Sequence, residues 1–319
     1  MILRLGYVAM TLNLEDCTPS GTVTYTLYKK LESEEAKKMR LTRVAKSNLN
    51  NTFRILKYNK ALNIDVYRLT SKLIPLATHE ELSNWDYQQD FREQFLEIGE
   101  FIKKCDFRVS AHPDHFTLLN PKDERVLEDS IKDLDYHIKL FEAMGLYDSK
   151  YKLVIHVGGV YANKAKSIER FKDNFTKLPD RIKSRIMLEN DDKSYSAMDV
   201  LEICEELKIP MVLDVHHHNC INNGEKLKDL LSRIYDTWKD EKYPPKIHFS
   251  SPKSEKDFRS HADYINVEDF VAFIEVARQQ KMDIDVMLEA KMKDNALIEL
   301  SNELSKKGFK RINNGTFNL

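Results

Sequence analysis

The sequence has few of the residues that mark several common classes of protein. Only 9 glycines and 9 prolines occur among 319 residues, too few for a collagen-like or low-complexity chain. Only 4 cysteines occur, and none forms a Cys-x-x-Cys pair, so we expect reduced thiols in a cytoplasmic protein. The chain also has no apolar run of about 18 residues, so we predict no membrane span.

Neither sign of charge is in excess. Lysine and arginine total 50, and aspartate and glutamate total 51, which gives a formal net charge of −1. Such a chain has no overall field that would draw it to nucleic acid or to a membrane surface. Contact with nucleic acid would therefore need a local basic patch or bound cations. No obligate protein partner is indicated.

Eight short apolar runs, rich in β-branched residues, recur along the chain. Several are apolar almost throughout, as is typical of parallel strands that are covered on both faces. We predict strands at residues 2–8, 64–69, 107–111, 152–157, 185–188, 211–215, 246–249 and 284–288.

Helical patterns lie between these runs, with apolar residues every three or four positions. They cover residues 91–102, 127–141, 200–207, 227–238 and 267–274 and, less regularly, 39–62, 162–178 and 292–306. Asn223 and Asn266 are predicted N-caps, and Gly145 is a predicted C-terminal cap. Segments 9–38 and 250–265 are long loops of the kind that shape an active-site face.

The alternation of strands and helices predicts a single (β/α)8 TIM barrel over residues 1–306. Residues 307–319 are polar, and we expect them to form a loose C-terminal tail. An open doubly wound sheet is the alternative fold. It is less favoured because no glycine-rich phosphate turn follows the first strand.

Histidine or a carboxylate stands at the end of several successive strands. The residues are His112, His156, Glu189, Asp214, His216–His218, His248 and Glu289, with His79 and His261 in nearby loops. In a barrel these strand ends converge on one rim. Clustered carboxylates would repel one another and resist burial, and divalent cations would relieve that cost. The sequence therefore predicts a metal cluster at the C-terminal rim.

The kinds of ligand restrict the metal. Imidazoles mixed with carboxylates, without thiolates, suit Mn²⁺, Zn²⁺, Fe²⁺ or Co²⁺ better than Mg²⁺ or Ca²⁺. The predicted ligands outnumber those that one ion takes, so we expect two to three divalent ions. Neighbouring ions suit in-line displacement at phosphorus, in which one activates water and others hold the phosphate and the leaving oxygen.

Lys246 is the exceptional member of the set. It lies two residues before His248, so both side chains should face into the barrel. An ammonium group beside cations would be repelled, which leaves two interpretations open. Lys246 either pairs with a carboxylate or a phosphate, or is carboxylated and serves as an anionic ligand.

Seven motifs, in order and over nearly the whole chain, resemble those of the UV damage endonucleases, which belong with the endonuclease IV-like metal barrels. They are Arg4–Tyr7, Ser110–Pro113, Leu188–Asp191, Asp214–His217, Lys246–His248, Ser260–Tyr264 and Leu288–Lys291. The resemblance implies a DNA-repair enzyme that acts on UV-damaged double-stranded DNA. Such an enzyme nicks immediately 5′ of a cyclobutane pyrimidine dimer or a 6-4 photoproduct, leaving a 3′-hydroxyl and a 5′-phosphate.

The resemblance also implies ligand sets for up to three ions, with manganese favoured. The first ion would take His112, His156 and Glu189, the second Glu189, Asp214, His248 and Glu289, and the third His217 and His261. Lys246 matches a lysine that is carboxylated in relatives, and His79 matches a further active-site histidine. Catalytic roles would fall to Glu189, Asp214, Glu289, Lys246 and His79. Strict alternation from Asp214 selects His216 instead of His217, and we follow the resemblance.

Contacts to the lesion are implied for Tyr7, His115 and Phe116. Relatives carry Gln-Tyr where this chain has His115 and Phe116, so the lesion preference is open. Phe116 can still wedge into the base stack as an apolar aromatic. Tyr7 is either a residue of the lesion pocket or an ordinary core tyrosine. Rim cations should hold flanking phosphates, with Lys29, Lys30, Lys253, Lys256 and Arg259 as candidates.

Two other functions stay open on the sequence alone. A metal-dependent sugar isomerase or epimerase of the same barrel class would also place carboxylates and histidines at strand ends, but predicts a closed sugar pocket without DNA contact. A non-enzymatic protein that binds damaged DNA or stores metal is the other. The density of carboxylates suited to catalysis argues against it.

Overall fold

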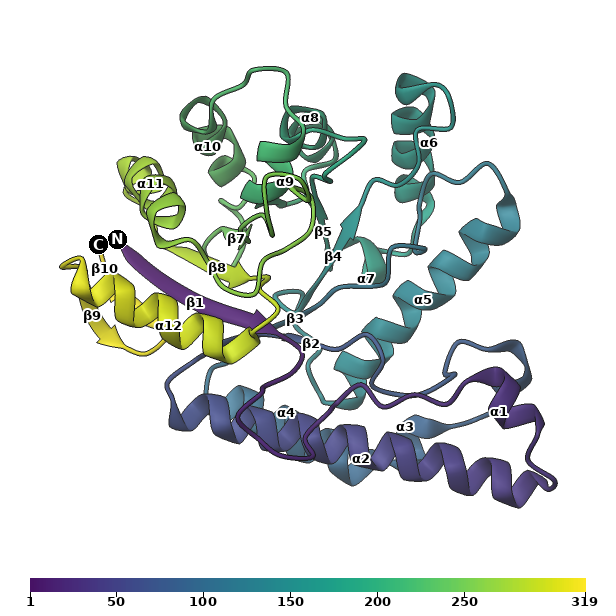
Figure 1. The fold of residues 1–319 in the computed structure, drawn as a ribbon. Helices are drawn as coiled ribbons and strands as arrows, with labels where there is room; N and C mark the ends of the chain where they lie inside the picture. The colour runs from purple at the N-terminus through teal and green to yellow at the C-terminus, as the bar shows by residue number, and fades with distance from the viewer.

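Eight parallel strands close into a barrel at the centre of the computed structural model, which describes all 319 residues (Figure 1). Neighbouring strands pair from β2 to β8, and β1 pairs with both β2 and β8. The strands are β1 (Ile2–Val8), β2 (Val66–Leu69), β3 (Arg108–Ala111), β4 (Lys152–His156), β5 (Ile186–Glu189), β6 (Met211–Asp214), β7 (Lys246–Phe249) and β8 (Ile284–Leu288). The predicted barrel is confirmed.

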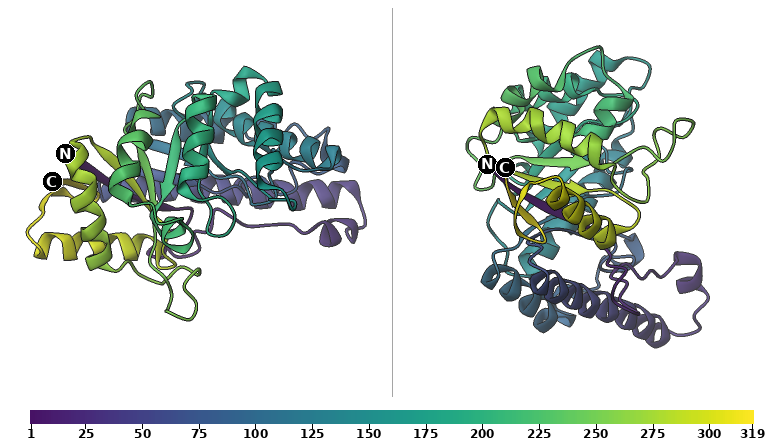
Figure 2. Two further views of the ribbon diagram at one scale, coloured as in Figure 1. Left: turned by 90° about the horizontal axis from the view of Figure 1, so that it is seen from above. Right: turned by 60° about the vertical axis from the view of Figure 1, so that its left-hand side comes forward.

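Helices cover the outside of the barrel, as the two views in Figure 2 show. They are α1 (Tyr25–Lys29), α2 (Glu34–Ala61), α3 (Tyr87–Asp90), α4 (Arg92–Lys104), α5 (Glu124–Ala143), α6 (Lys164–Lys177), α7 (Asp180–Lys183), α8 (Ala197–Leu207), α9 (Val215–Cys220), α10 (Leu227–Asp236), α11 (Val267–Ala277) and α12 (Lys293–Lys306), with short 3-10 helices η1 (Glu80–Leu82) and η2 (Arg278–Gln280). None combines the length and the apolar character that a membrane span requires.

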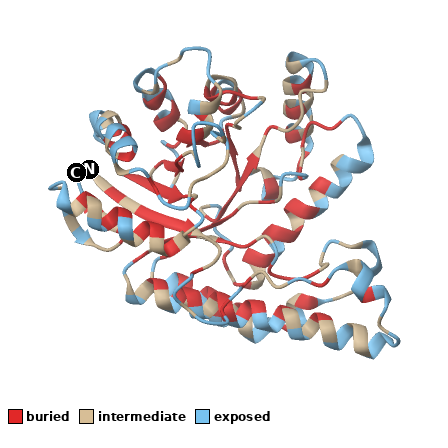
Figure 3. Cartoon of the chain, in the orientation of Figure 1, coloured by how far each residue is buried: buried red, intermediate tan, exposed pale blue.

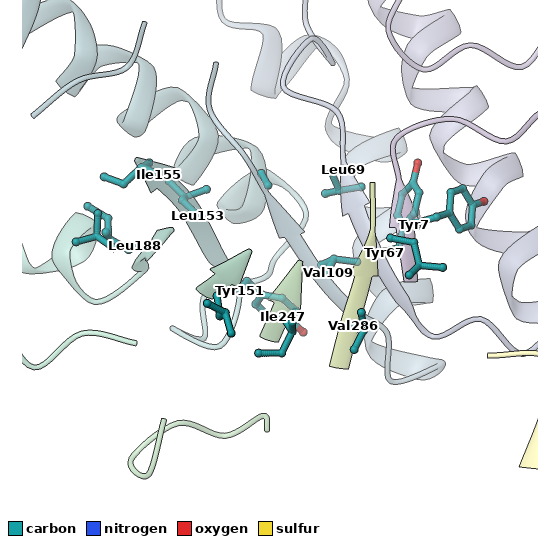
Figure 4. Packing of buried hydrophobic residues seen from close by; sticks show 14 of the residues in the cluster. Tyr7, Tyr67, Leu69, Val109, Tyr151, Leu153, Ile155, Leu188, Ile247 and Val286 are labelled. Atoms are coloured by element: carbon teal, nitrogen blue, oxygen red, sulfur yellow. The ribbon is translucent and has the colours of Figure 1, made fainter. Parts of the chain in front are cut away.

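The buried side chains form one main core. Figure 3 shows the strands buried nearly throughout and the helices buried on their inner faces. One cluster of 69 buried hydrophobic residues draws on strands and helices along the whole chain, so the barrel and its helices share a single core. Figure 4 shows part of it, with Tyr7 and Tyr67 side by side.

The helix caps match the sequence patterns in part. Asn266 caps α11 as predicted, since its side chain accepts from the backbone N–H groups of Glu268 and Asp269. The cap predicted at Asn223 is wrong. Its backbone N–H donates to Glu225 in a turn, and α10 begins only at Leu227. The long segment 9–38 includes α1 and the start of α2, because Ser33 caps α2.

The C-terminal residues correct another prediction. Instead of a loose tail, they form a hairpin of β9 (Lys310–Asn313) and β10 (Thr316–Asn318), and β10 pairs antiparallel with the start of β1. Phe317 is completely buried, because alternation along β10 turns its ring into the core while its neighbours stay accessible. Both chain ends consequently lie next to each other (Figure 1).

Candidate metal centre

The predicted ligands come together where the parallel strands end. The register places His156 beside Glu189 across β4 and β5, and Asp214 beside His248 across β6 and β7. His112 follows β3 directly, and Glu289 follows β8. The common direction of the strands therefore puts ligands from six strands at one end of the barrel.

Glu189 is the centre of the cluster. Its carboxylate is only 1% exposed, and four imidazoles lie within 4 Å of it, the most distant being that of His217 at 3.9 Å. Oε2 lies 3.0 Å from Nε2 of His112 and 3.6 Å from Nε2 of His156. Oε1 lies 2.7 Å from Nδ1 of His248. One carboxylate thus links ligands that arise from three other strands.

Three groups of residues bring their ligand atoms within 4.8 Å of one another, and Glu189 belongs to all three. The groups are His112, His156 and Glu189; Glu189, Asp214 and His217; and Glu189, His248 and Glu289. The first group coincides with the ligand set implied for the first ion. Asp214 groups with His217, whereas the resemblance implied that it joins His248 and Glu289.

Backbone carbonyls fix the orientation of three of the histidines. Nδ1 of His112 donates to the carbonyl of Pro113 at 2.9 Å, and Nδ1 of His156 to the carbonyl of Glu189 at 3.3 Å. Nδ1 of His217 donates to the carbonyl of Asn190 at 2.8 Å. A carbonyl can only accept, so in the neutral form of each ring Nε2 keeps a free lone pair. Metal-binding histidines are commonly held in this way.

Two buried atoms of the cluster have no hydrogen-bond partner, namely Oδ2 of Asp214 and Nε2 of His248. Unsatisfied buried polar atoms are costly and therefore rare. In addition, both nitrogens of His112 face an acceptor, the carbonyl of Pro113 at 2.9 Å and an oxygen of Glu189 at 3.0 Å, so a neutral ring satisfies only one of the two. The residues fit divalent cations, which would satisfy these acceptors together.

Burial and neighbouring charges shift the pKa values of two carboxylates, Asp214 and Glu189, in opposite directions. Burial, reinforced by Glu189 and Glu289, raises the pKa of Asp214 to about 7 despite the opposing effect of His217. Burial would also raise the pKa of Glu189, but the imidazoles of His248 and His156 outweigh it and hold that pKa well below the usual range. Burial lowers the pKa of His217, yet Asp214 and Glu189 together raise it to about 9. Without cations the cluster retains protons.

His217 lies in the cluster, and His216 does not. Strand β6 ends at Asp214, which caps the short helix α9 by accepting from the backbone N–H of His217 at 2.7 Å. In a helix, positions three apart share a face, so the alternation that would select His216 no longer applies. Nε2 of His216 instead donates to the carbonyl of Arg259 at 3.3 Å.

His261 lies beside the cluster but outside the three groups. Its Nδ1 is 3.9 Å from Oε2 of Glu289, and its ring centroid is 6.3 Å from that of His217. The loop that carries it is held by backbone hydrogen bonds between Lys253 and Ser260 and between Ala262 and Ser251.

Lys246 is fully buried in the barrel, and its Nζ donates to Oγ of Ser110 at 2.6 Å. Its Nζ forms no ion pair with a carboxylate, so the carboxylate partner of the first interpretation is wrong. Pairing with a phosphate and carboxylation both stay predictions. Burial, and then the charge of Arg108, lower the pKa of this amine well below its usual value.

His79 is not brought to the cluster. Its ring stacks on Tyr25 with centroids 4.0 Å apart, and its Nδ1 accepts from the backbone N–H of Glu81. The loop after β2 packs against α5, where the backbone N–H of Ile74 donates to Tyr136, and this carries His79 away from the strand ends. His79 lines a separate cavity of about 770 Å³ beside α5.

The predicted lesion contacts divide between surface and core. Phe116 is 57% exposed, and the neighbouring His115 is exposed too, on the loop after β3. Tyr7 has no exposed surface, and its hydroxyl donates to Asn59 of α2 at 2.5 Å. Arg4 faces the barrel interior, so Tyr7, three residues later, faces the helices. Direct contact between Tyr7 and DNA is not available in this structure.

Three of the five rim cations predicted to hold phosphates are already paired with carboxylates. Lys29 lies 2.9 Å from Glu81, Lys253 lies 3.3 Å from Asp257, and Arg259 lies 2.6 Å from Asp192. The other two, Lys30 and Lys256, are exposed and have no ion pair. A phosphate would have to compete with the paired carboxylates at three of these positions.

The motifs did not reveal two residues at the cluster. Nη1 of Arg68, on β2, lies 2.5 Å from Oε1 of Glu289. The side chain of Asn190 donates to the carbonyl of Asp214 and accepts from its N–H, both at 2.9 Å, and so ties β5 to β6. The position of Arg68 inside a buried strand was a signal that the sequence offered. Asn190 belongs to the motif Leu188–Asp191, but the motif assigned it no role.

Comparison with known proteins gives consistent matches. The family model for UV-endonuclease UvdE matches residues 3–318. The UV DNA damage endonuclease of Bacillus cereus (strain 03BB102) is 45% identical over 317 residues, which cover 99% of both chains. The crystal structure of SacUVDE superposes with a TM-score of 0.84 at 36% identity and covers 96% of this chain and 99% of that one. The 3-keto-D-glucoside 4-epimerase YcjR from E. coli shares the fold, with a TM-score of 0.57 at 12% identity, over 94% of this chain and 99% of that one.

Proposed function

The chain belongs to the UV-endonuclease UvdE family, and from that premise we propose that it repairs UV-damaged double-stranded DNA by nicking it. The cut falls immediately 5′ of a cyclobutane pyrimidine dimer or a 6-4 photoproduct. Hydrolysis adds water across the P–O3′ bond, so that phosphorus keeps the new oxygen and O3′ gains a proton. The products carry a 3′-hydroxyl and a 5′-phosphate.

The observation that carries this proposal is the ligand cluster around Glu189, which is buried yet leaves Asp214 and His248 with unsatisfied atoms. Two to three divalent ions fit it, with manganese favoured and zinc, cobalt and iron as alternatives. The residues that would hold them are His112, His156, Glu189, Asp214, His217, His248, His261 and Glu289. When bound, such ions supply Lewis acidity and a water nucleophile at neutral pH.

The chain's own residues prepare the centre before substrate arrives. The carbonyls of Pro113, Glu189 and Asn190 hold three imidazoles in the tautomer that leaves Nε2 free. Asn190 holds the ends of β5 and β6 together, so Glu189 and Asp214 keep their separation. Preorganised groups of this kind need no rearrangement when charge develops on the phosphate.

Lys246 is proposed to be carboxylated in the active protein. A neutral amine reacts with carbon dioxide by forming an N–C bond and releasing one proton, which yields an anionic carbamate. Complete burial, which favours the neutral amine, supports this proposal. Mass spectrometry of the native protein, compared with acid-treated protein, would detect the added group.

Lesion recognition is assigned to the exposed loop after β3. A damaged dinucleotide stacks and pairs poorly, so its extrusion from the duplex costs less than the extrusion of intact bases. Phe116 is exposed and apolar, as a wedge must be, and His115 lies against it with ring centroids 5.9 Å apart. The positions of His79 and Tyr7 give neither a contact with the cluster, so the proposed centre does not include them.

The four cysteines are all free thiols in the structure. This state suits a reducing compartment, and we place the protein in the cytoplasm on that ground.

The decisive experiment is a nicking assay on three labelled duplexes, with one cyclobutane dimer, one abasic site or no damage. Each is incubated with Mn²⁺ and with EDTA. We expect one cut, directly 5′ of the dimer, in Mn²⁺ alone. Cutting only at the abasic site would contradict the proposed substrate, and no cutting of any duplex would overturn the endonuclease function.

A further inference from the structure

A crevice of about 240 Å³ lies between the metal centre and the loop after β3 that carries His115 and Phe116, here called the lesion loop. The ends of β1, β2 and β3 form its walls. Its lining includes both the proposed ligand His112 and His115 of the loop after β3. A strand whose lesion is held at Phe116 and whose phosphate reacts at the cluster must pass through this space. The lining of the crevice is therefore placed to contact that phosphate.

Arg68 is the one cationic side chain of arginine or lysine in this lining. Its side chain is 13% exposed. The ion pair with Glu289 at 2.5 Å is the only hydrogen bond that its guanidinium makes. A guanidinium carries five N–H donors in a planar fork that matches phosphate oxygens. Its Nε and Nη2 groups make no hydrogen bond to the protein, so they are available to an anion in the crevice.

Lys293 adds a second cation next to Glu289. Its ammonium forms no ion pair. Burial, and then the charge of Arg68, lower its pKa, while the charge of Glu289 opposes them. Its backbone φ of 47° lies in the left-handed region, which a lysine rarely adopts. Strained backbone of this kind clusters at functional sites. Arg68 is thus paired with Glu289, which is also a candidate metal ligand, and the unpaired Lys293 lies within the electrostatic influence of both.

We propose that Arg68, with Lys293 beside it, binds a non-bridging oxygen of the phosphodiester that is cleaved. This inference rests on the proposed function for the identity of the phosphate. Asp114 is the only carboxylate in the crevice, and it lies 3.5 Å from Oγ of Ser71. Arg68 would be a catalytic residue in direct contact with substrate, because charge on the phosphate oxygens builds up as water attacks.

The first test measures inorganic phosphate binding to metal-free protein by ³¹P NMR. We expect Arg68→Gln and Lys293→Gln to weaken binding about 10-fold, and Arg68→Lys to fall between, because it keeps the charge but loses the fork. Arg278→Gln and Lys281→Gln are matched controls, since Arg278 is an arginine on the surface and Lys281 is an exposed lysine with a φ of 54°. Equal binding by wild type and Arg68→Gln would overturn the proposal.

The second test uses the metal-loaded protein and the dimer duplex. Arg68→Gln should keep the wild-type metal content, measured by mass spectrometry of the metal, while kcat/KM for nicking falls about 100-fold. A loss of metal with unchanged phosphate binding would reduce Arg68 to a partner of Glu289 and contradict the proposal. If the wild type cuts no duplex, the proposed function fails, but the phosphate measurement still decides the role of Arg68.

Discussion

The two ends of the barrel bury carboxylates in opposite ways. At the end where the strands begin, Asp285 is completely buried and accepts from Arg4 at 2.6 and 2.5 Å and from Arg108 at 2.5 Å. At the end where they finish, Glu189 is 1% exposed, and its nearest partners are His112 and His248. Both carboxylates are buried, but only one has permanent cations as partners.

The difference shows at which end of the barrel folding alone neutralises the buried carboxylate. Arginine is always protonated, so Asp285 is neutralised as soon as the chain folds. Imidazoles neutralise Glu189 only when they are protonated, and otherwise the site needs bound cations. We therefore expect the end at Asp285 to determine stability and the end at Glu189 to determine activity. Each prediction below tests that division.

The largest effect is expected at Glu189. Glu189→Gln keeps the shape but removes the charge shared by all three ligand groups, so nicking of the dimer duplex should fall about 10⁴-fold or more. Metal content should fall with it, whereas the thermal unfolding midpoint of the metal-free protein should not decrease. Glu289→Gln should behave alike. Full activity in either variant would contradict the metal assignment.

The complementary change is Asp285→Asn. It leaves Arg108, which is 4% exposed, without its carboxylate, and breaking a buried pair costs about 3–5 kcal/mol. Urea unfolding of the metal-free protein should show this loss. Glu205→Gln, which removes an exposed pair with Arg233, is the control and should cost no more than about 1 kcal/mol. If Asp285→Asn matched that control, the proposed division would be wrong.

A third effect depends on pH. The pKa of Asp214 in the metal-free protein is raised to about 7, so the folded protein holds a proton that the unfolded chain has already lost. That proton stabilises the metal-free protein at low pH, and the stabilisation disappears as pH rises through about 7. His217, whose pKa is raised to about 9, holds a second proton in this range. Because metal must displace both protons, Mn²⁺ affinity should rise by up to about 100-fold per unit between pH 5 and pH 7.

Calorimetric titration with Mn²⁺ in two buffers of different ionisation enthalpy measures the released protons directly. Wild type should release both protons below pH 7, and Asp214→Asn should bind more weakly and release one proton fewer. Equal proton release by wild type and Asp214→Asn would show that Asp214 is already ionised in the metal-free protein.

The smallest effect is expected at Phe116, which lies at the active end but outside the ligand groups. Phe116→Ala should lower the preference for damaged over intact duplex about 10-fold, since an aromatic stack on a base contributes about 1–3 kcal/mol. Competition binding with both duplexes measures this ratio, and the metal content should stay unchanged. An unaltered ratio would remove the wedge role.

Local patterns predicted most of the fold because they act over short distances. Apolar runs marked all eight barrel strands, and Asn266 was identified as a cap from its position alone. The same reasoning missed the hairpin at the C-terminus. Residues 307–319 read as polar, and nothing local indicates that Phe317 is buried against strand β1.

The candidate site shows the same limit. Strand ends marked His112, Glu189 and Asp214, because parallel strands must end together on one rim. Arg68 on β2 reaches Glu289 after β8 past the intervening strand β1, and no spacing in the sequence encodes that meeting. The motif Arg4–Tyr7 likewise does not indicate that the side chain of Tyr7 turns toward α2.

The sequence by itself determined the order of strands, the barrel and the kinds of ligand at its rim, because periodicity and residue type are local properties. The tertiary structure alone decided which of the candidate side chains lie together in the site. The start of α9 selected His217 over His216, closure of the barrel placed Lys246 against Ser110, and the outward loop removed His79 from the centre. These outcomes depend on contacts between residues far apart in the chain, and only folding brings those residues together.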